Sequence, residues 1–193
     1  YVRERRNVLC SGEDIVIGAG IQSLLHILCP LLEQRQTVSF PNPSFIQGST
    51  VFHDYGFQVD YRNKDCDIIY VSPAHMTKWG DIMPVSRRLE LVNYSAAHGS
   101  LVIEDDFENE FVYLQKPTPS LFGWQAVRMW CIWEPFPDFC CPPSVSVLWS
   151  CLQSCLHCTE KKQTNIIRQH QRQSRLLCAS LSGMVTWQHR PVS

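Results

Sequence analysis

The chain has 193 residues and a formal net charge of −1, with 45% hydrophobic and 18% charged residues. These values are typical of a globular domain and exclude a disordered or collagen-like chain. No apolar run approaches the ~20 residues that a membrane-spanning helix needs, so we expect no membrane partner. The nearly balanced charge gives no electrostatic reason to expect nucleic acid on this part of the chain.

The composition changes near Leu121. Seven of the ten cysteines and five of the six tryptophans follow this residue, whereas 15 of the 18 acidic residues lie within residues 1–121. We therefore interpret residues 1–121 as one domain and residues 122–193 as a separate segment without a recognisable domain. The three cysteines of the first segment suit a cytoplasmic protein.

Short apolar strands alternate with helices in the first segment. Strands are predicted at 14–18, 37–40, 57–61, 66–71 and 101–103, and helices at 21–32 and 84–98. The second helix has a proline at its start and Gly99 just past its end, both typical of helix boundaries. This alternation predicts an α/β fold with three αβα layers and a mainly parallel sheet.

Three motifs follow predicted strands, where parallel α/β sheets bind their ligands. They are Gly18-Ala19-Gly20, Pro73-Ala74-His75 and Asp105-Asp106-Phe107. The glycine motif leads into a helix, where free N–H groups favour a phosphate, although short glycine turns are common and the motif taken alone is more typical of a tight turn. The aspartates could hold a ligand N–H or pyridinium, or else form a helix cap or a salt bridge.

Other residues have the same two interpretations. Phe45 could stack on a flat ring or belong to the core, and His75 could bind a ligand or be structural. Arg87 and Arg88 are interpreted as the solvated face of their helix. A phosphate site, an aromatic ring and an acid, in this order, suit pyridoxal 5′-phosphate (PLP).

Five segments resemble the aminotransferase-like domain of MocR/GabR-type transcriptional regulators of the GntR family. They are EDIVIGAGIQSLL, FPNPSF, IIYVSPAH, IMPVSRRLELVNYSAAHGSLVIEDDFENEF and PTPSL, in family order within residues 1–121. The resemblance implies part of the large domain of fold type I PLP-dependent transferases, the fold of class I/II aminotransferases. It implies PLP as cofactor and an amino compound as effector or substrate.

The resemblance also assigns cofactor-binding roles to single positions. The amides around Ala19 and Gly20 would hold the phosphate, Phe45 would stack on the ring, and Asp105 would pair with the pyridine nitrogen. His75 matches a histidine of the family. Phe107 stands where the family has a tyrosine that contacts the ring oxygen, a hydrogen bond that phenylalanine cannot make.

Relatives of this type carry a winged-helix domain that binds DNA, and they form homodimers. The chain begins at Tyr1 without methionine or a winged helix, so we expect it to be an internal fragment of a cytoplasmic protein. DNA would then be bound only through the missing domain.

The sequence after Leu121 lacks the family's Ser-Lys segment, whose lysine forms the Schiff base. We back-translated residues 129–151 with degenerate codons and read the result one base earlier. This shifted frame permits the sequence NVVYLGTFSRFLLPSIRISFMVL, which resembles the next segment of the family. We therefore expect the chain to be out of frame from about residue 122. The shifted codon at the lysine position spans Pro137 and Asp138 and cannot encode lysine, so no catalytic residue is expected.

Other interpretations of the chain stay open. Cys151, Cys155 and Cys158, with His157, have roughly zinc-like spacing, but a strong zinc signature has two paired CxxC-type motifs, so we expect no metal. The chain could also be a fragment of a free-standing aminotransferase, or the product of a pseudogene.

Overall fold

The computed structural model describes residues 15–18, 20–32, 35–73, 82–105, 120–121 and 146–149. Its strands are β1 (Ile15–Gly18), β2 (Thr37–Phe40), β3 (Gln58–Tyr61), β4 (Ile68–Val71), β5 (Leu101–Glu104) and β6 (Ser146–Trp149). Its helices are α2 (Gly20–Leu28), the 3₁₀ turn η2 (Cys29–Leu31), α3 (Ile46–Asp54) and α4 (Val85–His98).

Four strands form a parallel sheet, as predicted, and their order is β3-β2-β4-β5. Val38 pairs with Val59 on one side and with Ile68 on the other, and Ile69 pairs with Val102. β1 lies in a two-stranded sheet with β6, antiparallel, with Val16 opposite Leu148. All carboxyl ends of the four parallel strands therefore lie at one edge.

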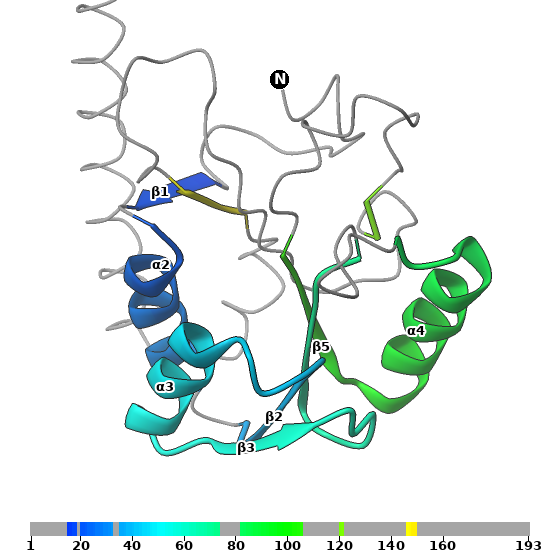
Figure 1. Ribbon diagram of the computed structural model, residues 1–193, viewed down its shortest axis with the longest axis horizontal. Helices are drawn as coiled ribbons and strands as arrows, with labels where there is room; N and C mark the ends of the chain where they lie inside the picture. Colours follow the sequence, from blue (N-terminus) through cyan, green and yellow to red (C-terminus); the bar gives the residue numbers. More distant parts are fainter. Residues whose placement is uncertain are drawn as a thin grey trace, which may run out of the picture.

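Helices cover both faces of the parallel sheet, with α2 and α3 on one side and α4 on the other (Figure 1). Side chains of β4 alternate between the layers: Ile68 and Tyr70 join the core under α2 and α3, whereas Ile69 and Val71 join the core under α4. The three-layer αβα fold predicted from the sequence is confirmed.

Two helices agree with the sequence patterns that predict them. α2 buries Ile21, Leu24, Leu25 and Leu28, the positions spaced at one helical face. α4 begins after Pro84 and ends at Gly99, whose φ of 69° is left-handed and therefore suits glycine.

One helix was not predicted, and one expectation is wrong. Helix α3 was not predicted, because IQGSTVFHD contains a glycine and β-branched residues and only a weak apolar face. Arg88, expected on a solvated face, is 2% exposed, whereas its neighbour Arg87 is exposed. Its Nε donates to the Met83 carbonyl at 2.9 Å and its Nη2 to the Pro73 carbonyl at 3.3 Å. Arg88 is buried because backbone carbonyls accept its hydrogen bonds.

Leu121 belongs to the packed fold. It is fully buried in the core under α4, and its backbone N–H donates to both carboxylate oxygens of Glu104, at 3.2 and 3.0 Å. The chain therefore returns to the end of β5 at this residue, where the composition changes.

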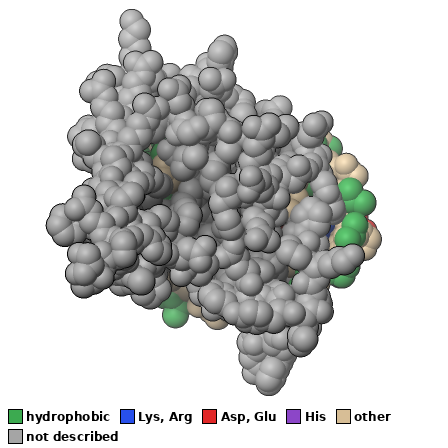
Figure 2. Space-filling model, turned by 90° about the horizontal axis from the view of Figure 1, so that it is seen from above, with side chains coloured by type: hydrophobic (Ala, Val, Ile, Leu, Met, Phe, Trp, Pro, Cys, Tyr) green, Lys and Arg blue, Asp and Glu red, His purple; other side chains and the backbone are tan. Residues whose placement is uncertain are grey.

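Part of the surface of α4 is apolar. Val85 and Leu89, one turn apart, are 54% and 46% exposed. Seen from above, hydrophobic side chains reach the surface on the side where α4 lies (Figure 2). In the part of the chain that the structure describes, no helix is long and apolar enough to cross a bilayer.

Candidate functional site

The candidate site lies where the carboxyl ends of β2, β4 and β5 meet. Asp105 directly follows β5, and Phe45 follows β2 after a four-residue loop. Gly20 begins α2, two residues after the end of β1. Of the predicted cofactor-binding residues, Ala19, His75 and Phe107 lie outside the described residues, so their roles stay predictions.

Gly20 gives the start of α2 an open, glycine-specific geometry. Its φ is +85°, a conformation that side chains rarely adopt, and no atom lies within 4 Å of the place a Cβ would occupy. The first N–H groups of a helix have no partner within the helix, and the helix dipole favours an anion beside them. The residues at this terminus therefore fit the phosphate role predicted for Gly20.

The loop after β2 places Phe45 beside the sheet. Asn42 accepts a hydrogen bond from the Ser44 backbone N–H at 2.9 Å, an Asx turn that reverses the chain between two prolines. Phe45 then caps α3, and its carbonyl accepts the Ser49 backbone N–H at 3.3 Å. The loop and the first turn of α3 thus fix the backbone from which the ring projects.

The ring of Phe45 packs on other aromatic rings and stays partly exposed. It stacks on Tyr70, with 4.9 Å between ring centroids and 27° between planes, and lies 5.8 Å from Phe40. Gly48 lies under the ring edge: a Cβ there would be 2.7 Å from Cδ1 of Phe45. The glycine leaves the space that the ring occupies. The two interpretations of Phe45, core residue and stacking ring, are therefore compatible.

Asp105 is a buried carboxylate held from several directions. It is 6% exposed, and its Oδ2 accepts the Tyr70 hydroxyl at 2.7 Å. Its backbone N–H donates to the Val71 carbonyl at 2.7 Å, and its carbonyl accepts the Ser72 hydroxyl at 3.0 Å. These bonds continue the pairing of β4 with β5 by one residue, to Ser72 and Asp105.

Tyr70 joins two predicted site residues, and the sequence analysis missed it. Its ring lies against Phe45 and its hydroxyl donates to Asp105. The signal was the alternation of β5: Asp105 shares the parity of Leu101 and Ile103, which face α2 and α3. In β4, Tyr70 pairs with Ile103 and faces the same layer. The side chains of Tyr70 and Asp105 therefore project to the same side of the sheet.

The segment between β4 and α4, which contains His75, has its two flanking residues Pro73 and Met83 joined by hydrogen bonds. The Met83 backbone N–H donates to the Pro73 carbonyl at 2.7 Å, and the Arg88 guanidinium donates to the same carbonyl and to that of Met83. The two ends of segment 74–81 are therefore held together at the carboxyl end of β4, beside Asp105.

A polar cavity lies at the opposite edge of the sheet, before β4 and β5. It has a volume of about 220 Å³ and is lined by Asp65, Cys66, Asp67, Tyr94, His98, Gly99 and Ser100. The Tyr94 hydroxyl donates to Asp65 at 2.6 Å, and this bond raises the pKa of Tyr94. The Tyr94 and His98 rings stack at 3.9 Å. These polar groups bond one another rather than converge on the cavity.

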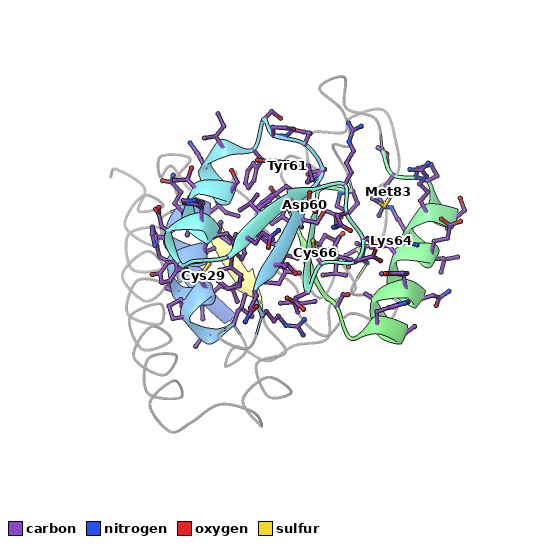
Figure 3. All side chains as sticks on the ribbon, turned by 90° about the horizontal axis from the view of Figure 1, so that it is seen from below. Cys29, Asp60, Tyr61, Lys64, Cys66 and Met83 are labelled. Carbon is purple, nitrogen blue, oxygen red and sulfur yellow. The ribbon has the colours of Figure 1, made fainter. Side chains whose placement is uncertain are left out.

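Cys29 and Cys66 are both buried free thiols in different parts of the molecule (Figure 3). Burial raises the pKa of Cys29 to about 12 and also raises that of Cys66. Neither thiol is therefore a nucleophile at neutral pH. Within the described ranges, no three His, Cys, Asp or Glu side chains are grouped to hold a metal ion, and the candidate zinc residues 151–158 lie outside these ranges.

No protein-family model matches the chain. The HTH-type transcriptional regulator YdeL of Bacillus subtilis is 32% identical over 136 residues, which cover 64% of this chain and 29% of YdeL. The pyridoxine biosynthesis regulator PdxR of Corynebacterium glutamicum is 25% identical over 133 residues, covering 63% and 29%. The probable rhizopine catabolism regulator MocR of Rhizobium meliloti is 23% identical over 137 residues, covering 64% and 28%.

The chain is homologous to MocR-type transcriptional regulators. It spans less than a third of the length of these regulators. Solved structures give the fold: an archaeal alanine:glyoxylate aminotransferase has a TM-score of 0.65 at 18% identity, covering 89% of this chain and 46% of the enzyme. Aminotransferase AspB of Helicobacter pylori has a TM-score of 0.67 at 12% identity, covering 86% and 50%. The fold is that of the fold type I PLP-dependent aminotransferases, as the resemblance implied.

Proposed function

We propose that residues 1–121 are the PLP-binding part of the aminotransferase-like effector domain of a cytoplasmic MocR-type regulator. One observation carries this proposal: the buried Asp105 and the partly exposed Phe45 both contact Tyr70 at the carboxyl edge of the parallel sheet. In the complete regulator, an amino compound would be the sensed ligand, a winged-helix domain would bind DNA, and the effector domains would form a homodimer.

Each of the three residue types has a separate task in this proposal. The backbone N–H groups at the start of α2, including that of Gly20, would donate hydrogen bonds to the phosphate, because they point out of the helix terminus. The ring of Phe45 covers one face of the pyridine ring and keeps water from it. The Asp105 carboxylate accepts the N–H of the protonated pyridine nitrogen.

PLP, when bound, supplies an aldehyde that condenses with amines and a ring that withdraws electrons from the attached carbon. In this proposal the chain binds and orients PLP but contributes no catalytic residue, because its sequence lacks the Schiff-base lysine of the family. The domain would therefore respond to a ligand rather than turn over a substrate.

Residues from about 122 onward, we further propose, are translated out of frame. The string read one base earlier has Ile-Ser-Phe-Met at positions 146–149, where the printed chain forms β6 antiparallel to β1. An apolar strand at this place suits both reading frames. Sequencing the gene across the Leu121 codon tests the proposal: one uninterrupted frame with no extra or missing base overturns it.

A free-standing aminotransferase is the alternative, favoured by the structural neighbours, which are enzymes. The two possibilities differ upstream of Tyr1. A winged-helix coding region in the same gene supports the regulator, and an aminotransferase start without one supports the enzyme.

Calorimetric titration of the 193-residue chain with pyridoxine 5′-phosphate tests the binding proposal. This ligand keeps the ring and the phosphate but has no aldehyde, so it needs no lysine. We expect one ligand per chain, with weaker binding of pyridoxine and of inorganic phosphate. Equal affinities for all three compounds would contradict the proposed site.

A further inference from the structure

We propose that Tyr70 is a positioning residue that sets both the aromatic ring and the acid of the cofactor site. Its ring backs Phe45 and its hydroxyl holds Asp105, so one buried side chain ties together the two groups that would contact the pyridine ring. This inference rests on the proposed function and adds to it a residue that would not itself touch the cofactor.

The burial of Tyr70 makes it a rigid reference point. The residue is 2% exposed and its ring also packs on Phe40, with 4.9 Å between centroids. Phe40 in turn packs edge-on against Phe52 of α3. The Tyr70 ring therefore lies between Phe40 of β2 and Phe45, the N-cap residue of α3, and cannot change rotamer without displacing them.

The hydroxyl bond selects one orientation of the acid. A phenol donating to Oδ2 at 2.7 Å fixes the rotation of the carboxylate plane. An ionised, oriented carboxylate is what a protonated ring nitrogen requires as its partner. The hydroxyl therefore affects the contact to the ring nitrogen and leaves the stacking contact intact.

Gly48 sets the other contact. An alanine at this position would place its Cβ inside the space of the Phe45 ring, so the ring would have to move off Tyr70. Gly48 is in the first turn of α3, where alanine is otherwise favourable for the helix. The substitution Gly48→Ala therefore alters the stacking ring and does not change Asp105 or its bond.

The experiment measures affinity for two ligands with the full chain: pyridoxine 5′-phosphate and its carbocyclic analogue, in which C–H replaces the ring nitrogen. The wild-type chain should prefer the nitrogen-containing ligand. Tyr70→Phe keeps the ring and should lose part of this preference, with about fivefold weaker binding of pyridoxine 5′-phosphate and unchanged binding of the analogue. Gly48→Ala should weaken both ligands equally.

The outcomes separate the two proposals. If the wild-type chain binds neither ligand, the proposed function fails and the role of Tyr70 falls with it. If it binds both and Tyr70→Phe keeps the full preference for the ring nitrogen, only the role of Tyr70 is wrong. A loss of affinity for both ligands in Tyr70→Phe would show a general packing role and would also overturn the inference.

Discussion

The two edges of the parallel sheet each hold an aspartate, and the two carboxylates are held in different ways. At the amino edge, Asp67 accepts the backbone N–H groups of Gln36 and Thr37 and the Thr37 hydroxyl, at 2.9 to 3.0 Å. At the carboxyl edge, Asp105 accepts the Tyr70 phenol beside a partly exposed aromatic ring. One carboxylate joins strands, and the other is presented beside the ring that would cover a ligand.

The surroundings of Asp67 support a structural role. Arg35 donates to the carbonyls of Asp67 and Gly99, which links the start of β2 to β4 and to the end of α4. Burial acts to raise the pKa of Asp67, but its hydrogen bonds to Gln36 and Thr37 and the charge of Arg35 outweigh burial and lower it. The comparison therefore predicts that variants at the two edges change different properties.

Arg88→Met should give the largest loss of stability, about 3 kcal/mol in the free energy of unfolding. The carbonyls of Pro73 and Met83 lose a buried donor, and the ends of segment 74–81 are then joined by the Met83–Pro73 backbone bond without the guanidinium. Urea unfolding monitored by circular dichroism measures this loss, and the exposed Arg87→Met is the matched control. Equal, small effects of the two substitutions would contradict the buried role of Arg88.

Asp105→Asn should weaken pyridoxine 5′-phosphate binding about 30-fold and change stability little. The amide keeps the shape of the side chain and can still accept from Tyr70, but it removes the charge that pairs with the ring nitrogen. Titration calorimetry gives the affinity. Unchanged affinity in a folded variant would assign Asp105 to structure alone and erase the difference between the two edges.

Asp67→Asn should do the reverse, lowering the free energy of unfolding by about 1.5 kcal/mol without changing ligand affinity. The folded-state pKa of Asp67 is depressed, so its stabilisation is complete above the unfolded-state pKa and is lost as pH falls through the folded one. Below about pH 4 the two stability curves should therefore converge. If the free energies of unfolding of wild type and Asp67→Asn stay equally far apart down to pH 2, the ionised carboxylate of Asp67 is not the source of the difference in stability.

Cys29 gives the smallest expected effect. With its pKa raised to about 12, the thiol should remain unmodified by iodoacetamide at pH 8 in the folded chain and react after unfolding. Peptide mass spectrometry measures the modification of Cys29 itself. Rapid labelling in the folded chain would mean that α2 does not pack on the sheet as described.

The sequence predicts those parts of the fold whose signals are local. The face of α2 and the proline and glycine that bound α4 are such signals, and both helices are confirmed. Helix α3 and the burial of Arg88 depend on tertiary contacts that no local pattern records. Phe45 and Asp105 were selected by their place after strands, but Tyr70, which joins them, follows only when β4 and β5 are paired in register.

The nitrogen-15 NMR spectrum of bound pyridoxine 5′-phosphate, labelled at the ring nitrogen, tests the central claim most directly. We expect one bound species with a protonated nitrogen near neutral pH, and loss of this signal in Asp105→Asn. A bound ligand whose nitrogen titrates as it does in water, in the wild-type chain and the variant alike, would contradict the assignment of Asp105 to the cofactor ring.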